Sequence, residues 1–322
     1  VPATSFESSG ANIGPPQIEF LLRKNEIVYL AEMMNYPGVI NKDPDVMQKL
    51  EIAKRLGKKI DGHAPGLRGE ECKEYIAAGI STDHECTSYE EGKEKISYGM
   101  KVLIREGSAA KNFNALIPLL SEYPSEVMFC SDDKHPHDLV NGHINELVKR
   151  AVASGASLFD ALNAAITNPI EHYGLDVGQL NVGDKADFII VDDLENFKVT
   201  STYIDGIEVF ADGDIKFPAP EFDNPNNFSL KAIKPSDLEL KGNAGIYRII
   251  EVQDGQLLTL EKEHQLESDS NGNVQLDVNK DVLKMVVLSR YDQSRPAIAF
   301  TKGFGLKKGA IASSVAHDSH NI

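Results

Sequence analysis

The chain has 322 residues, 41% of them hydrophobic and 25% charged, which is enough to bury a sizeable core and to form two or three domains. Its formal net charge of −16 and isoelectric point near 5.0 argue against a nucleic-acid partner, because phosphate backbones are bound through an excess of Lys and Arg. No apolar run approaches the roughly 18 residues of a membrane span and no leader-like segment opens the chain, so we expect a soluble, cytoplasmic protein with no membrane partner.

Short apolar runs alternate with amphipathic segments between residues 27 and 133, a pattern typical of βα units that build a parallel sheet. The helix over 44–56 is the best marked, because Asp43 can cap it, Pro44 suits its first turn and Gly57 suits its end. The pattern predicts strands at 27–30, 59–63, 80–84, 101–106 and 126–132, and further helices at 69–78, 90–98, 113–123, 143–153 and 158–167.

Each of these five strands finishes at or next to a polar residue that can bind or catalyse. In a (β/α)8 barrel the active site lies at the carboxyl ends of the strands. We therefore expect these residues to surround one barrel mouth: Glu32, His63, His84, Glu106 and Asp132.

After Thr167 the pattern changes to short alternating strands, at 188–192 and as a pair over 199–210 with an Asp205-Gly206 turn. A segment rich in Pro, Asn and Asp follows and is typical of a linker. Asp-Gly and Asn-Gly turns at 254 and 271 then indicate a β-rich final part. We expect a partial barrel over 1–170, a small β unit over 171–217 and a C-terminal α+β domain over 218–322.

Two histidines, His63 and His84, follow successive predicted strands, and neutral imidazole is a common ligand of divalent transition metals. A single histidine there is more often a polar loop residue, but two in register favour a metal site. The nearby acids Asp61, Asp83 and Glu85 are expected to orient the imidazoles.

Asp132 ends the last predicted strand and is followed by a second acid, Asp133. One interpretation makes the two acids a helix cap. The other makes Asp132 a metal ligand that also accepts the proton that hydrolysis releases, because it lies closer to the strand. Glu32 has two interpretations as well, a carboxylate that bridges two metal ions or an ion pair at the barrel mouth.

Five segments of the barrel part, and three beyond it, resemble successive motifs of bacterial adenine deaminases in the amidohydrolase superfamily. The resemblance keeps the family's order, covers essentially the whole chain and implies an α/β fold, an amidohydrolase-type (β/α)8 barrel. The segments are 31–39 (AEMMNYPGV), 61–66 (DGHAPG), 81–86 (STDHEC), 105–112 (REGSAAKN), 130–136 (CSDDKHP), 142–144 (GHI), 183–187 (GDKAD) and 303–309 (GFGLKKG).

The resemblance also implies a mechanism. The family holds two ions, manganese or iron with zinc also possible, on a His-x-His pair from the first strand, a bridging glutamate, two histidines and an aspartate. The matching residues here are Glu32, His63, His84 and Asp132. In the family a metal-held hydroxide attacks C6 of adenine and the aspartate takes its proton. Ammonia then leaves and hypoxanthine remains, a reaction of purine salvage.

Adenine is accordingly the expected partner, and we expect a homo-oligomer. Glu106, Ser108 and His135 are candidate contacts to the purine ring. The segment around His317, Asp318 and His320 has two interpretations, a turn with exposed histidines or a lid that closes over the barrel mouth and binds the purine edge. The isolated histidines His172 and His264 are expected at the surface.

The chain departs from the family in one respect, because no His-x-His pair precedes Glu32. We expect a barrel that lacks its first strands, with residues 1–10 ending the third, and this makes activity of the chain by itself doubtful. Two alternatives stay open. One is another cyclic amidine or amide hydrolase on the same scaffold, and the other is an inactive fragment with an assembly or regulatory role.

Overall fold

The computed structural model describes residues 11–108, 110–223, 228–254 and 259–313. These residues form two compact units, one of residues 13–222 and one formed mainly by residues 223–322. None of the helices in the described part of the chain has the length and apolar character that a bilayer span requires. The domain boundaries expected after residues 170 and 217 stay a prediction.

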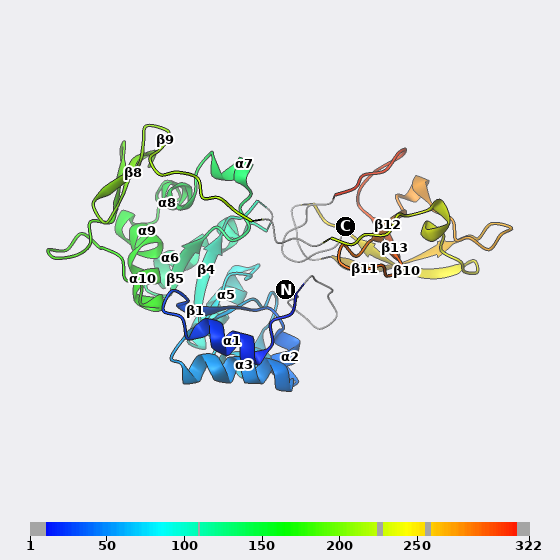
Figure 1. Ribbon diagram of the computed structural model, residues 1–322, viewed down its shortest axis with the longest axis horizontal. Helices are drawn as coiled ribbons and strands as arrows, with labels where there is room; N and C mark the ends of the chain where they lie inside the picture. The colour runs from blue at the N-terminus through cyan, green and yellow to red at the C-terminus, as the bar shows by residue number, and fades with distance from the viewer. Residues whose placement is uncertain (1–10, 109, 224–227, 255–258, 314–322) are drawn as a thin grey trace. The chain divides into compact units, whose positions relative to one another are not determined.

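The first unit is built on a five-stranded sheet whose strands follow one another in chain order and are all parallel (Figure 1). This order is the one that successive strands take in a (β/α)8 barrel, and it brings all five carboxyl ends to one edge. The predicted strands are confirmed, with ends shifted by a few residues. They are β1 (Tyr29–Met33), β2 (Lys59–Gly62), β3 (Thr82–Asp83), β4 (Lys101–Arg105) and β5 (Val127–Cys130).

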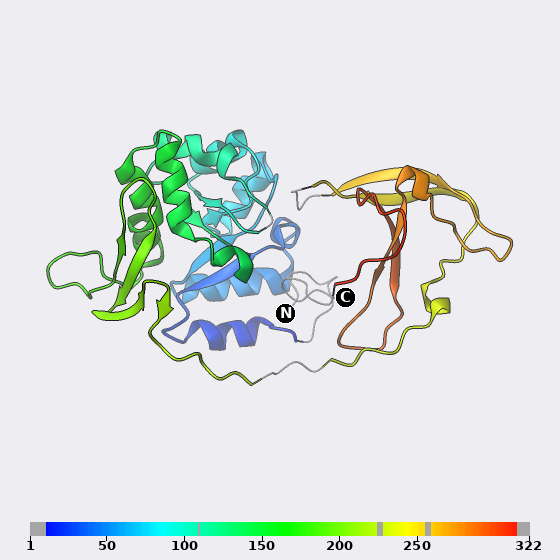
Figure 2. The same cartoon turned by 90° about the horizontal axis from the view of Figure 1, so that it is seen from above.

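Helices connect these strands, and the start of α3 shows how the sequence defines them. The Asp43 carboxylate accepts hydrogen bonds from the backbone N–H groups of Asp45 and Val46 at 2.9 and 3.2 Å, which caps the helix as predicted. Figure 2 shows α1 and α3 lying side by side. The helices are α1 (Pro15–Leu22), α2 (Tyr36–Ile40), α3 (Pro44–Arg55), α4 (Gly69–Ala77), α5 (Tyr89–Ser97), α6 (Phe113–Glu122), α7 (Pro136–Leu139), α8 (Ile144–Ala153), α9 (Leu158–Ala165) and α10 (Thr167–Tyr173).

The core of this unit consists of two clusters of buried side chains. One includes Leu50, Ile60 and Tyr75 and packs β1 and β2 against α3 and α4. The other includes Ile104 and Leu116 and packs β4 and β5 against α6, α8 and α9. Strands buried on both faces account for the nearly continuous apolar runs in β4 and β5.

A small antiparallel sheet, β6-β7-β8-β9, belongs to the same unit. The predicted Asp205-Gly206 turn is confirmed, with φ of 49° and 77° at its two residues, the left-handed values that a tight hairpin needs. Phe197 is 4% exposed and joins the second core cluster, and Asn145 Nδ2 donates to its carbonyl at 3.0 Å. The strands are β6 (Phe188–Val191), β7 (Val199–Ile204), β8 (Ile207–Ala211) and β9 (Asp214–Ile215).

The second unit is built on a four-stranded sheet in the order β11-β10-β13-β12, with a parallel pair, β10 and β13, at its centre. Its own core includes Ile249, Leu266 and Phe300. The predicted Asn271-Gly272 turn is present, with a φ of 74° at the glycine. The elements are η1 (Pro235–Leu238), β10 (Gly245–Glu251), β11 (Leu260–Leu266), η2 (Val278–Lys280), β12 (Leu283–Val287) and β13 (Ala297–Lys302).

Candidate metal centre

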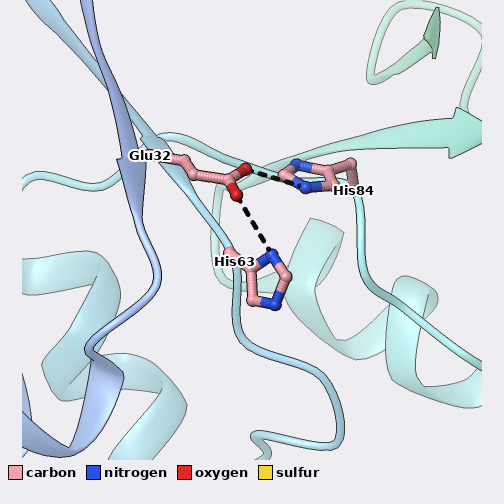
Figure 3. Close-up of side chains that lie close together, drawn as sticks. All are labelled: Glu32, His63 and His84. Atoms are coloured by element: carbon pink, nitrogen blue, oxygen red, sulfur yellow. Dashed lines mark ion pairs between the residues drawn. The ribbon is translucent and has the colours of Figure 1, made fainter. Parts of the chain in front are cut away.

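Three predicted ligands meet at the carboxyl edge of the parallel sheet. Glu32 lies in β1, His63 directly follows β2 and His84 directly follows β3. Figure 3 shows the Glu32 carboxylate lying between the two imidazole rings. Glu32 Oε2 lies 2.9 Å from His84 Nε2, and Glu32 Oε1 lies 3.4 Å from His63 Nδ1. The three ligand atoms lie within 4.8 Å of one another, close enough to hold one metal ion.

The facing ring nitrogens form ion pairs with Glu32 and are also placed so that they could bind a metal ion. Both His63 Nδ1 and His84 Nε2 are buried and have no hydrogen-bond partner among the described residues, although Glu32 is near. A buried nitrogen without a partner is costly unless something else satisfies it. Two imidazole nitrogens and a carboxylate that converge in this way are a donor set that a divalent transition metal would complete. The residues present therefore fit a metal ion.

The charges of the group also suit metal binding. Burial by itself raises the pKa of Glu32, but the adjacent His63 and His84 rings outweigh it and lower the pKa to about 2. Burial lowers the pKa of His84, but the Glu32 carboxylate outweighs that effect, and the net shift is upward. The Glu32 carboxylate is therefore anionic across the physiological range, the form that a metal ion would bind.

Two further charged residues lie at the site: Glu85, which was expected to orient the imidazoles, and Arg105, which was not predicted as part of it. Glu85 Oε1 lies 3.6 Å from His84 Nε2 and 3.8 Å from His63 Nδ1. Arg105, the last residue of β4, is 2% exposed and forms an ion pair with Glu85. A charge at the end of an apolar strand needs a partner when it is buried, so the apolar run before Arg105 could have marked it as a candidate beside Glu106.

Asp132 reaches the site from the loop after β5. Its Oδ2 lies 2.6 Å from Arg105 Nη1 and 3.8 Å from His84 Nε2. A left-handed backbone, with φ of 44°, turns the chain at this residue. Asp133 is more distant, with its carboxylate 4.0 Å from Arg105 Nη2. The preference for Asp132 over Asp133 thus agrees with the contacts, and His84, Glu85 and Asp132 form a second group spaced for a metal ion.

Glu106, predicted at the same mouth, makes its contacts elsewhere. Its carboxylate accepts a hydrogen bond from Arg150 Nη1 at 2.6 Å and from the Phe113 backbone N–H at 3.3 Å. Successive side chains of a strand point to opposite faces, and Arg105 takes the direction of the metal ligands. Glu106 instead lines a cavity of about 160 Å³ together with Gly107, Lys111, Lys134, Asp138, Asn141, Glu146, Leu147 and Arg150.

The other predicted substrate contacts lie beside this cavity or outside the described residues. The Ser108 hydroxyl donates to Asp138, which lines the cavity, and accepts from the backbone N–H of His135 at 2.8 Å. The His135 side chain is exposed. The remaining candidates, His317, Asp318 and His320, lie outside the described residues and stay a prediction.

Two of the acids expected to orient the imidazoles do not contact them. Asp61 accepts hydrogen bonds from Thr82 Oγ1 at 2.8 Å and from the Tyr173 hydroxyl at 2.9 Å. Asp83 binds Lys95 instead. Alternation explains the position of Asp83, because it directly precedes His84 and its side chain points to the opposite face. Asp61 is held by Thr82 and Tyr173 instead.

The expected surface position of His172 is also wrong. His172 is only 8% exposed, and its Nε2 lies 3.3 Å from the Ser81 hydroxyl. The residue is on α10, a helix that the sequence analysis did not predict. His264 lies on β11, is partly exposed and is 3.1 Å from Asp277 Oδ2.

Two models of known protein families match the sequence of this chain. The model of the amidohydrolase family matches residues 16–209, and the model of the adenine deaminase C-terminal domain matches residues 256–322. A beta-aspartyl dipeptidase from Fervidobacterium islandicum AW-1 has a similar structure, with a TM-score of 0.50 and 17% identity over 64% of this chain and 62% of that one. At this identity the likeness is one of fold.

Similarity in sequence is closer to two curated proteins named adenine deaminase. The one from Sulfurovum sp. (strain NBC37-1) is 55% identical over 100% of this chain, which covers 59% of that relative. The one from Methanosarcina mazei is 51% identical over 100% of this chain, which covers 60% of that relative. The chain thus spans about three fifths of the length of these relatives.

Proposed function

Since the chain belongs to the amidohydrolase family, we propose that it forms the larger part of an enzyme that converts adenine and water to hypoxanthine and ammonia. The observation that carries the proposal is the convergence of two buried imidazole nitrogens on Glu32, with all three ligand atoms within 4.8 Å of one another. The curated relatives named adenine deaminase, at 51–55% identity, support the choice of substrate. Purine salvage is the matching metabolic role.

We propose that Glu32, His63 and His84 hold a divalent metal ion, with Mn²⁺ or Fe²⁺ as the native metal and Zn²⁺ as a further candidate. Nitrogen and carboxylate ligands suit all three ions, and ligand softness does not separate them. When bound, such an ion supplies Lewis acidity close to the reacting carbon. A second ion needs ligands beyond this group, because each imidazole nitrogen binds one metal.

Asp132 is proposed as the group that accepts a proton from water and returns it to the leaving amine. Its Oδ2 lies 3.8 Å from His84 Nε2, in the group of His84, Glu85 and Asp132 that is also spaced for a metal ion, so we propose that Asp132 is a metal ligand as well. Arg105 holds the same oxygen at 2.6 Å and thereby fixes the direction of the carboxylate. A fixed carboxylate next to the ligands has the position that proton transfer requires.

Glu106, Ser108 and His135 stay proposed contacts of the purine; Glu106 lines the cavity that Asp138 also lines, and Ser108 and His135 lie at its border. Adenine presents both hydrogen-bond donors and acceptors along its edge, and the cavity offers carboxylates and amino groups that match both. A neutral base also suits a chain with a net charge of −16, which would repel anionic substrates.

A substrate panel tests the proposal. The full-length protein, loaded with Mn²⁺, would be followed for ammonia release from adenine, adenosine, cytosine and guanine. We expect release from adenine above the other three. Release from cytosine alone would favour the alternative, another cyclic amidine hydrolase on the same scaffold. A protein that binds metal but releases ammonia from none of them would contradict the proposed activity. We further propose that the protein is cytoplasmic and forms a homo-oligomer. Sedimentation of the same preparation tests the oligomeric state.

A further inference from the structure

Buried side chains connect each ligand-bearing strand end to the next one, and the first of them is Tyr75. This α4 residue is fully buried. Its hydroxyl accepts a hydrogen bond from the backbone N–H of His63 at 3.0 Å and donates one to the carbonyl of Met33 at 2.5 Å. Met33 follows Glu32, so one hydroxyl joins the ends of β1 and β2. Gly62 permits the approach, because a Cβ there would lie 2.9 Å from the same hydroxyl.

The second connection is Lys95 of α5, which is 1% exposed. Its Nζ donates to the carbonyl of Ala64 at 2.7 Å, to Asp83 Oδ2 at 2.5 Å and to Glu91 Oε1 at 2.7 Å. Ala64 follows one candidate histidine and Asp83 precedes the other. All three ammonium protons are therefore used to join the ends of β2 and β3.

Glu91, also on α5 and 2% exposed, strengthens this connection. Its carboxylate accepts from the backbone N–H of Gly66 at 2.8 Å and from that of Thr87 at 2.9 Å. These two residues lie in the loops that follow the two candidate histidines. The Lys95 and Glu91 pair thus binds both loops to one helix.

The third connection is Asn112, which is 9% exposed and precedes α6. Its Nδ2 donates to the carbonyls of His84 at 3.0 Å and Cys86 at 3.1 Å. Its Oδ1 accepts from the backbone N–H of Arg105 at 2.7 Å. One amide side chain therefore joins the end of β3 to the end of β4.

We propose that these three side chains, Tyr75, Lys95 and Asn112, are positioning residues that set the spacing of the candidate metal ligands. The inference rests on the metal site of the proposed function. None of the three contributes an atom to the group of Glu32, His63 and His84, yet each fixes backbone within one residue of a ligand. Metal affinity depends steeply on ligand placement, and partners that hold ligands typically contribute about 10- to 100-fold to it.

The test compares variants of the full-length protein: Tyr75→Phe, Lys95→Met and Asn112→Ala. Two quantities are measured for each, the Mn²⁺ dissociation constant by chelator competition and the urea unfolding midpoint without metal. All three variants are expected to bind Mn²⁺ about 10- to 100-fold more weakly than the wild type. Tyr75→Phe removes one oxygen atom and keeps the ring. If Lys95→Met does not fold, the Mn²⁺ dissociation constant of Tyr75→Phe therefore still tests the positioning role.

Asn168→Ala is the matched control. Asn168 is 8% exposed, and like Asn112 its Nδ2 donates to two backbone carbonyls, those of Pro124 and Val127, both at 2.7 Å. Val127 begins β5, so this amide supports the end of the sheet opposite to the ligands. Asn168→Ala is expected to lower the unfolding midpoint as Asn112→Ala does, and to leave the Mn²⁺ dissociation constant unchanged.

Two results would overturn the inference while the metal site stands. One is wild-type Mn²⁺ affinity in all three variants, and the other is an Asn168→Ala variant that loses as much affinity as Asn112→Ala. A wild-type protein that binds no Mn²⁺ would overturn both the metal site and this inference. The wild-type measurement thus separates failure of the proposed function from failure of the positioning role.

Discussion

Arg105 Nη1 lies 2.6 Å from Asp132 Oδ2, and this contact joins the end of β4 to the loop after β5 at the candidate metal centre. The guanidinium is buried, pairs with Glu85 as well and lies 4.0 Å from Asp133, so a single cation faces three carboxylates. Glu32 contacts the imidazoles instead. Arg105 therefore balances charge in the site before any metal ion is bound.

Replacing Arg105 by Gln should leave the buried Glu85 carboxylate and the more exposed Asp132 carboxylate without their counter-charge. We expect the free energy of unfolding of the metal-free protein to fall by about 3–5 kcal/mol, as when one partner of a buried ion pair is removed. Added Mn²⁺ should then raise the unfolding midpoint more in the variant than in the wild type. Arg150→Gln, which breaks the partly exposed pair with Glu106, is the control and should show no such metal dependence. If Mn²⁺ raises the unfolding midpoint of Arg105→Gln and of the wild type by the same amount, the charge-balancing role is contradicted.

Replacing Asp132 by Asn should remove the proton acceptor and keep its shape. We expect the turnover number for adenine to fall by about 10²- to 10⁴-fold, the usual contribution of a general acid–base group. Steady-state ammonia release measures this, and Asp133→Asn is the matched control that should stay active. An inactive Asp133→Asn beside an active Asp132→Asn would transfer the role to Asp133.

Replacing His63 or His84 by Ala should abolish metal binding and ammonia release together, because each ring directs a nitrogen at the same point. Elemental analysis of the purified full-length variants gives the metal content. His264→Ala serves as the control, because His264 pairs with Asp277 in the second unit. A His63→Ala protein with the metal content of the wild type would refute the ligand assignment.

His172 should make the free energy of unfolding decrease as the pH becomes acidic. Burial, with the nearby charges of Lys59 and Lys101, lowers the pKa of His172 to about 4. The neutral ring is therefore favoured in the folded state, and its full contribution is present above the unfolded pKa of about 6.5. This contribution is lost as pH falls from about 6.5 to about 4 and amounts to at most about 3 kcal/mol.

The comparison for His172 is between the wild type and His172→Gln, both with chelator. Urea unfolding at several pH values gives the two stability profiles. The difference in free energy of unfolding between the wild type and His172→Gln should narrow as the pH falls from about 6.5 to about 4 and stay constant below that. Parallel profiles throughout would show that His172 does not titrate in this way.

The order of strands and the polar residue at each strand end allowed the sequence to predict Glu32, His63 and His84 as neighbours. This succeeded because parallel strands in chain order must present their ends at one edge. The choice between Arg105 and Glu106 could not be made, because it depends on which of two adjacent side chains faces the site. A shift of one residue in a strand reverses that direction.

Other features depended on contacts distant in sequence or on short segments. The helices α2 and α7 have five and four residues, too few for a hydrophobic period to be visible. The connections made by Tyr75 and Asn112 use backbone groups of other segments, such as Met33 and His84, and no local pattern marks such partners. Burial of His172 followed from the same kind of distant packing.

The packing of Phe197 into the second core cluster determines where the first unit can be cut. A fragment that stops at residue 170 would lose this ring and the Asn145 hydrogen bond, and would leave an apolar hollow open to water. The parallel sheet and the small β sheet should therefore melt in a single calorimetric transition. Any expression fragment or fusion junction should accordingly be placed after residue 222.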